Sequence, residues 1–268
     1  MSEAQLFTTM TFSEVYERVL VRPLFRPFAE ALIARLNPVQ GDSLLDVACG
    51  TGIAARIGRE KLGPGARIAG VDVAPPMLAV ARNVDATIDW REGNATSLPV
   101  GNSERFSLLT CHQGLQFVPD KVGAAREMRR VLAPGGRVAI ACWCSLQDIP
   151  VGLELNNIAE RHVGKIVDSR HSFGNSDALM ALLVDGGFRD VRVETFSHDV
   201  RLADGALYAR LNAMAVIGMS AKGKTMNETE RGELAGQIAA DSQEVIARFT
   251  KSGAFVFPLT TNIATARA

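Results

Sequence analysis

The feature that most constrains the fold is a short apolar run that ends in a glycine-containing turn. Leu44 to Val47 have the composition of a buried strand, and Gly50 and Gly52 follow directly before a helical pattern that begins at Ile53. Glycines in such a turn tolerate positive φ and let backbone N–H groups approach a ligand closely. The segment therefore predicts a strand, a ligand-binding loop and a helix of an α/β nucleotide-binding domain.

The surrounding sequence repeats this alternation of strand and helix, which is typical of βαβ units and a mostly parallel sheet. Strands are expected at 44–47, 67–71, 87–90, 106–111, 137–142 and 188–196, and helices at 53–61, 75–83, 120–132 and 176–184. A last strand at 254–266 leaves no room for a crossover helix, so it should run antiparallel. The expected fold is α/β: a Rossmann-like seven-stranded, mostly parallel sheet with helices on both faces.

We expect one domain that spans residues 1–268. Its first 36 residues should form two helices, one over 12–21 with Ser13 as N-cap and a break at Pro23, and one that ends at Leu36. Two stretches, 145–174 and 202–252, interrupt the alternation. They are expected to be helical cap insertions that set the choice of substrate.

Composition narrows the possible partners. Lys plus Arg and Asp plus Glu number 29 each, so the chain has no basic footprint for nucleic acid. No leader pattern and no long apolar stretch is present, which predicts a soluble cytoplasmic protein without membrane contact. Cys111, Cys142 and Cys144 lie in strand-like runs, and no residue stands at the spacing that would complete a metal site with them. Reduced thiols and no metal are expected.

Acidic side chains at strand ends indicate which nucleotide would bind. Asp46 would point a carboxylate into the glycine turn, where it would repel a pyrophosphate but suit an ammonium group. Asp72 follows the second strand at the position of an acid that accepts hydrogen bonds from ribose hydroxyls. Asn94, after the third strand, could bond an adenine edge; alternatively it only forms an Asx-turn in a polar loop.

Together these residues resemble the class I S-adenosylmethionine-dependent methyltransferases, and are loosely similar to the ubiquinone/menaquinone type that acts on small molecules. The segments that carry the resemblance are 44–52, 70–73, 92–99, 111–120 and 132–137. The resemblance implies S-adenosyl-L-methionine as cofactor. It also implies a cofactor site made of Asp46, Ala48, Gly50, Gly52, Asp72, Val73, Asn94, Ala95, His112 and Gln113.

Two departures from that family's pattern bear on chemistry. The family often has Asp where this chain has Asn94, and often has His where this chain has Gln116, whose amide cannot act as a base. Methyl transfer mainly requires that the acceptor and the methyl group be aligned; a base is needed only when the acceptor must lose a proton. The candidate catalytic residues are His112, Gln116 and Tyr16, and the acceptor is expected to be a small aromatic or hydrophobic molecule.

Two other functions stay open on the sequence alone. The spacing of Gly50, Gly52 and Ala55 loosely fits the fingerprint of an NAD-dependent oxidoreductase, although Asp46 opposes it. The second open function is the binding of S-adenosylmethionine without catalysis, because a fold alone does not determine a function.

Overall fold

The computed structural model describes residues 9–268 and divides the chain into two compact units. Unit 1 runs to Trp143 and adds Phe173–Phe196 and Thr261–Ala268. Unit 2 consists of Cys144–Ser172 and Ser197–Thr260. Nearly all of the two segments expected as insertions therefore belongs to unit 2.

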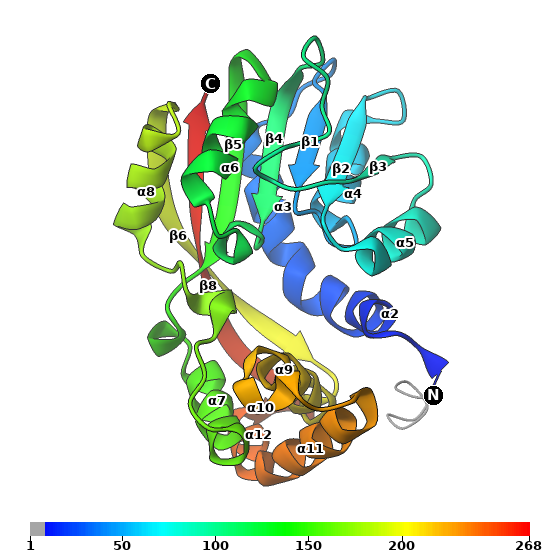
Figure 1. The fold of residues 1–268 in the computed structure, drawn as a ribbon, viewed down its shortest axis with the longest axis vertical. Coiled ribbons are helices and arrows are strands. Elements are labelled where there is room, and N and C mark those ends of the chain that lie inside the picture. Colours follow the sequence, from blue (N-terminus) through cyan, green and yellow to red (C-terminus); the bar gives the residue numbers. More distant parts are fainter. Residues whose placement is uncertain (1–8) are drawn as a thin grey trace. The chain divides into compact units, whose positions relative to one another are not determined.

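Unit 1 is built on the expected sheet, whose strand order is β3-β2-β1-β4-β5-β8-β6 (Figure 1). The first five strands pair in parallel, and β8 pairs antiparallel with β5, as the sequence predicts. The strands are β1 (Leu44–Val47), β2 (Ile68–Asp72), β3 (Asp89–Glu92), β4 (Phe106–His112), β5 (Leu132–Trp143), β6 (Arg189–Leu202), β7 (Thr250–Lys251) and β8 (Ala254–Arg267).

The expected number of seven strands is wrong, since eight occur within residues 9–268. The additional strand is β7, two residues long, which pairs antiparallel with the start of β8. Ser252 and Gly253 connect the two strands and both have positive φ. A two-residue loop of this kind matches the twist of a hairpin, and so short a strand has no hydrophobic pattern by which to be recognised.

Helices cover both faces of the sheet in unit 1, as predicted. Helices α3 (Arg26–Leu36), α4 (Ile53–Leu62) and α5 (Pro75–Val84) bury apolar side chains in one core, and α6 (Lys121–Val131) and α8 (Ser176–Asp185) in the other (Figure 1). The buried residues of α3 illustrate the cause, because Ala29, Leu32, Ile33 and Leu36 recur at helical spacing on one side.

The N-terminal helical segment differs from the prediction in two ways. Helix α2 (Phe12–Tyr16) is capped by Thr11, not Ser13, in a capping box with Glu14. The expected break at Pro23 is also absent. Residues Glu17–Phe25 form a π-helix that continues into α3, and the N–H of Arg26 donates to the carbonyl of Val21, five residues back. The wider turn accommodates a proline that an α-helix would not.

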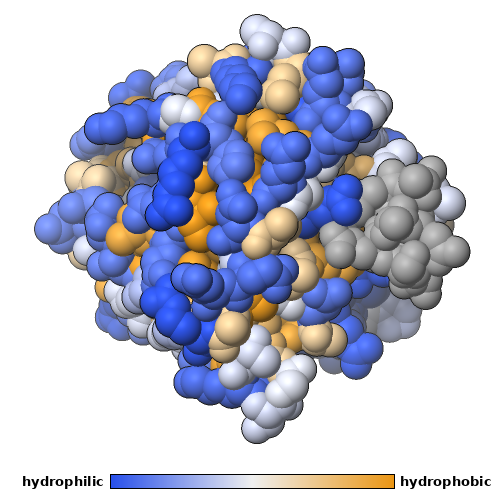
Figure 2. Space-filling model, turned by 90° about the horizontal axis from the view of Figure 1, so that it is seen from below, coloured by the Kyte–Doolittle hydropathy of each residue, from blue (hydrophilic) through white to orange (hydrophobic). Residues whose placement is uncertain are grey.

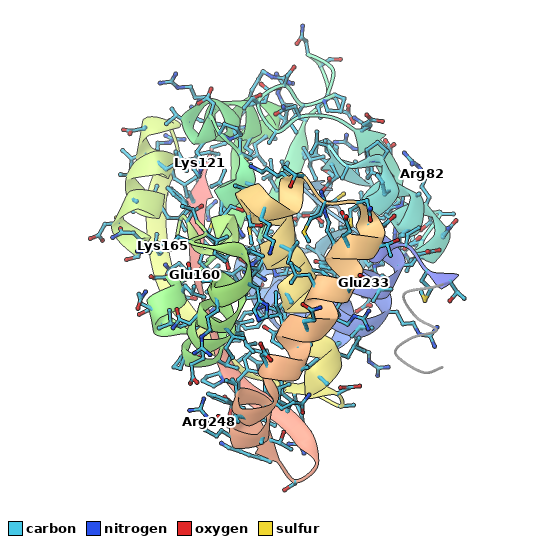
Figure 3. All side chains as sticks on the ribbon, turned by 60° about the horizontal axis from the view of Figure 1, so that its bottom comes forward. Arg82, Lys121, Glu160, Lys165, Glu233 and Arg248 are labelled. Carbon is cyan, nitrogen blue, oxygen red and sulfur yellow. The ribbon has the colours of Figure 1, made fainter. Side chains whose placement is uncertain are left out.

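Unit 2 is helical in both of its long segments, as expected for the insertions. Its helices are α7 (Pro150–Val163), α9 (Gly205–Met219), α10 (Ala221–Lys224), α11 (Glu228–Asp241) and α12 (Gln243–Phe249). Most leucine, isoleucine and valine side chains of these helices are buried. Glu233 and Arg248 on the helices and Lys165 after α7 are exposed (Figure 3). Polar side chains likewise predominate on the face of the molecule drawn in Figure 2. No helix within residues 9–268 is long and apolar enough to cross a membrane.

Candidate functional site

The loop that follows β1 makes a tight turn in which three residues have the left-handed backbone conformation. Ala48, Gly50 and Gly52 have φ values of 54°, 56° and 89°, and the Gly52 N–H donates to the Cys49 carbonyl at 2.8 Å. Because Ala48 has a Cβ atom, its positive φ is sterically strained. Backbone strain of this kind is concentrated at functional sites. The loop therefore has the backbone geometry that the glycine pattern predicts.

The two glycines of this loop serve different purposes. A Cβ on Gly52 would lie 2.1 Å from the ring of Trp90, and a Cβ on Gly70 of β2 would lie 2.3 Å from the same ring. A Cβ on Gly50 would meet no atom within 4 Å. Gly52 thus makes room for Trp90, a residue that the sequence analysis did not single out, while Gly50 leaves open space beside the loop.

Asp72 ties the end of β2 to the loop after β1. Its Oδ2 accepts a hydrogen bond from the Gly50 N–H at 2.7 Å, and its Oδ1 accepts one from the Ala74 N–H at 2.9 Å. Each carboxylate oxygen can accept at least one further hydrogen bond, so the half-buried group can still hold two hydroxyls. Val73, beside it, is 69% exposed and offers an apolar surface.

Asp46 lies beneath the loop and is only 1% exposed. Its Oδ1 accepts from the Thr110 hydroxyl at 2.8 Å and its Oδ2 accepts from the Ala55 N–H in the first turn of α4 at 3.2 Å. Burial is the main cause that raises the pKa of this carboxyl to about 7. Both hydrogen bonds go to protein groups, and they join the end of β1 to β4 and to the first turn of α4.

We expect this raised pKa to make the ligand-free protein less stable as the pH rises. Asp46 keeps its proton in the folded state up to about pH 7 and loses it near pH 4 when unfolded, so its contribution falls by up to roughly 4 kcal/mol between those values. Urea unfolding at pH 4.5 and pH 8 gives the change in the free energy of unfolding with pH for the wild type and for Asp46→Asn. The difference between the two changes isolates Asp46, because the other titrating groups contribute equally to both proteins. An identical pH dependence in both proteins would contradict the prediction.

Asn94 and Ala95 follow β3. Asn94 is exposed, and its Oδ1 accepts from both the N–H and the hydroxyl of Thr96, at 3.0 and 2.9 Å. This is the Asx-turn that the sequence left as an alternative. Ala95 is half-buried and packs against the core of the sheet.

Several buried polar atoms at the adjoining strand ends have no hydrogen-bond partner among residues 9–268. They are Thr51 Oγ1, His112 Nε2, Gln113 Oε1 and Gln116 Oε1. Buried polar atoms in folded proteins are nearly always paired. The turns after β1 and β4 that carry them also lie close together, since a Cβ on Gly114 would be 2.4 Å from the Cβ of Ala48. This grouping fits a site that a polar ligand completes.

Tyr16 and His112 are brought together through an aromatic cluster, which we define as Tyr16, Phe25, His112 and Trp143. Phe25 is its centre, with ring centroids 5.0 Å from Tyr16, 6.2 Å from His112 and 6.0 Å from Trp143. The sequence analysis named Tyr16 and His112 as candidate site residues. Nothing in the sequence distinguishes Phe25 and Trp143 from other apolar residues.

Two of the three predicted catalytic candidates can titrate, His112 and Tyr16, and burial shifts the pKa of each so that neither acts readily as a base near pH 7. Burial lowers the pKa of His112 to about 3, so the imidazole is neutral near pH 7 and is a weak base. Burial, followed by the charges of Glu17 and Asp72, raises the pKa of Tyr16 above its usual value. Its hydroxyl therefore stays protonated and can donate a hydrogen bond. No group of three or more potential metal ligands occurs within residues 9–268.

A family model described as a methyltransferase domain matches residues 45–140. The demethylmenaquinone methyltransferase of Halalkalibacterium halodurans is 31% identical over 212 residues, which cover 69% of this chain and 86% of that protein. The chloroplastic 2-phytyl-1,4-beta-naphthoquinone methyltransferase of Arabidopsis thaliana is 39% identical over 109 residues, 38% of this chain and 41% of that protein.

Among solved structures, phosphoethanolamine N-methyltransferase 2 of Haemonchus contortus in complex with S-adenosyl-L-methionine has a similar fold. The TM-score is 0.55 at 18% sequence identity, and the match covers 99% of this chain and 57% of that one.

Proposed function

The chain belongs to the class I S-adenosylmethionine-dependent methyltransferases, which here methylate a small molecule, and we propose that its acceptor is a flat aromatic compound bound against the aromatic cluster. The observation that carries this proposal is the grouping of the cluster with unpaired polar atoms of His112, Gln113 and Gln116. Aromatic rings favour stacked or edge-on contacts with other rings.

We assign the cofactor to the loops at the carboxyl ends of β1, β2, β3 and β4. Asp72 would accept hydrogen bonds from the ribose hydroxyls, with Val73 and Ala95 beside the adenine. The loop from Ala48 to Gly52 would hold the methionine end, in the open space next to Gly50. Asp46 would act from below by joining the end of β1 to β4 and to the first turn of α4.

Bound S-adenosylmethionine supplies an electrophilic methyl group, which the acceptor atom takes by in-line displacement. The protein has to position the acceptor and keep water out, and no nucleophilic side chain is required. Phe25 and Trp143 would fix the plane of the acceptor, and the Tyr16 hydroxyl would donate a hydrogen bond on the cofactor side. His112 would line the site as a neutral group, because its low pKa makes it a poor proton acceptor.

The names of the relatives support an aromatic acceptor for this chain. One relative is named for a 1,4-naphthoquinone, which has a fused two-ring system, and the other is named for demethylmenaquinone, which is also a quinone. A flat two-ring compound would also suit a wall made of aromatic side chains.

Label transfer tests the proposal directly. The protein is incubated with methyl-labelled S-adenosylmethionine and, separately, reduced 1,4-naphthoquinone, a simple phenol and an aliphatic amine. We expect label in the naphthalene product. Label only in the amine would contradict the aromatic acceptor.

Replacing His112 by asparagine tests its proposed role. We expect kcat to fall by no more than about tenfold, because the loss is one of packing and not of base catalysis, which is typically worth about a hundredfold or more. The pH profile of kcat should be the same in wild type and variant between pH 6 and pH 8. An inflection near pH 6.5 that the variant lacks would show that His112 does act as a base.

A further inference from the structure

The segment between β3 and β4 includes residues 94–100, which we call the adenine loop, and charged side chains from outside the loop bind its backbone. We propose that Glu127 is a positioning residue for the cofactor, because from α6 it fixes the adenine loop and thereby places Ala95 where the adenine binds. The proposal rests on the proposed function, since it requires the adenine to lie beside Ala95. It adds a residue from a helix that carries none of the candidate site residues.

The two ends of the adenine loop lie close together. The Ser97 N–H donates to the Asn94 carbonyl at 3.0 Å, so the chain turns back on itself directly after β3. A Cβ on Gly93, at the start of the turn, would lie 2.5 Å from the ring of Pro99, near its end. Because the end of the loop packs against its beginning, whatever holds the end also determines where Ala95 lies.

Three consecutive residues at the end of the loop each have one backbone group that is bonded by a charged side chain. The bonds are Leu98 N–H to Glu127 Oε1 at 2.9 Å, Arg91 Nη1 to the Pro99 carbonyl at 2.9 Å and Arg130 Nη2 to the Val100 carbonyl at 3.2 Å. Hydrogen bonds that involve a charged partner are stronger than neutral ones. The end of the loop is therefore held from β3 on one side and from α6 on the other.

Glu127 is the residue on which the α6 side depends. Its two oxygens accept from Nη2 and Nε of Arg130, at 2.7 Å each. These bonds are the main cause that holds the pKa of Glu127 below its usual value, so the group is an ionised acceptor near pH 7. Since Glu127 also orients Arg130 toward Val100, removal of its carboxylate releases two of the three backbone bonds.

A loop that is fixed before the ligand arrives binds that ligand more tightly, because less conformational freedom is lost on binding. If the adenine loop were released, it would have to be ordered when the nucleoside binds, and the cost would appear as lost affinity. The methionine end of the cofactor is assigned to the loop after β1, which is held independently by the bond between Asp72 and the Gly50 N–H. The effect of Glu127 should therefore be confined to the nucleoside.

Calorimetric titration of the full-length protein with two ligands tests this. S-adenosylhomocysteine has both ends of the cofactor, whereas 5′-methylthioadenosine has the nucleoside and lacks the amino-acid end. Glu127→Ala removes the acceptor, and Glu127→Gln keeps an oxygen for the Leu98 N–H. Thermal unfolding of each variant checks that the fold is retained.

Asp42→Ala is the matched control. Asp42 is likewise a carboxylate that accepts a backbone N–H, that of Val39 at 2.9 Å, and pairs with an arginine, Arg137. It precedes β1, however, and so lies at the end of that strand opposite to the cofactor loop. A loss of affinity that arises only from a weakened fold would appear in this control as well.

We expect Glu127→Ala to bind both ligands about tenfold more weakly than the wild type, by the same factor because the two share the nucleoside. Glu127→Gln should bind both within about threefold of the wild type, and Asp42→Ala within about twofold. Should Glu127→Ala fail to fold, Arg130→Leu, which removes the bond to Val100 alone, is expected to weaken both ligands by about threefold.

The proposal is overturned if Glu127→Ala, or Arg130→Leu in its place, binds both ligands as Asp42→Ala does. A loss that Glu127→Gln fails to restore would overturn it too, because an acceptor for the Leu98 N–H is still present. So would a loss for S-adenosylhomocysteine alone, since that result assigns the effect to the methionine end. These titrations contain no methyl acceptor, so failure of the proposed aromatic acceptor is recognised separately, by label transfer.

Discussion

Replacing Asp72 by alanine is expected to weaken S-adenosylmethionine binding by at least about a hundredfold while the protein still unfolds cooperatively. The carboxylate would bond two ribose hydroxyls, and hydrogen bonds to a charged group are worth about 1.5 to 3 kcal/mol each. The change also removes the acceptor of the Gly50 and Ala74 N–H groups, which loosens the loop that holds the methionine end.

Calorimetric titration measures this effect. Asp85→Ala is a matched control, because Asp85 is also a carboxylate that accepts a nearby backbone N–H, that of Thr87, but it lies at the other end of α5. Its affinity should stay within about twofold of wild type. If Asp72→Ala binds S-adenosylmethionine as the control does, the ribose is not held at β2.

Valine substitutions at Gly50 and Gly52 are expected to have opposite consequences. At Gly52 the added Cβ would overlap the Trp90 ring at 2.1 Å and the residue would have a φ of 89°, so we expect a loss of more than about 3 kcal/mol of stability. At Gly50 the Cβ meets no atom, and only the backbone cost of about 1 to 2 kcal/mol applies.

Gly50→Val should therefore fold yet lose measurable cofactor binding, since its side chain fills the space that we assign to the ligand. Thermal unfolding and titration of both variants test the pair. A Gly50→Val protein that binds S-adenosylmethionine within about twofold of wild type would place the cofactor elsewhere, and a normally stable Gly52→Val protein would contradict the packing of Trp90.

Much of the fold could be predicted because its elements have local signals. The strands at 44–47 and 106–112, the turn at Gly50 and the acid at Asp72 each carry a composition or spacing that few alternatives share. Local sequence patterns gave wrong predictions where the backbone conformation depends on contacts with residues distant in the sequence. Pro23 normally breaks a helix, and nothing local indicates that a π-helical turn accommodates it.

The candidate site likewise contains residues that local sequence patterns point to and residues that they do not. Asp46 and the glycine loop lie in one short segment, and Asp72 ends the next strand along the chain, so the sequence could point to them. Glu127 could not be found in this way, because it is one of several charged residues on an amphipathic helix and reaches Leu98 only through the packing of α6 beside the adenine loop. The protonation of His112 was equally out of reach, since its lowered pKa arises from burial that the sequence does not encode locally.

A crystal structure of the protein with S-adenosylhomocysteine tests the central claim most directly. We predict that the ribose hydroxyls lie within hydrogen-bond distance of the Asp72 carboxylate, that the amino-acid end rests on the loop from Ala48 to Gly52, and that the sulfur faces the turn of His112 and Gln113. Electron density for the nucleoside at any other edge of the sheet, with Asp72 bonded only to Gly50 and Ala74, would contradict the account.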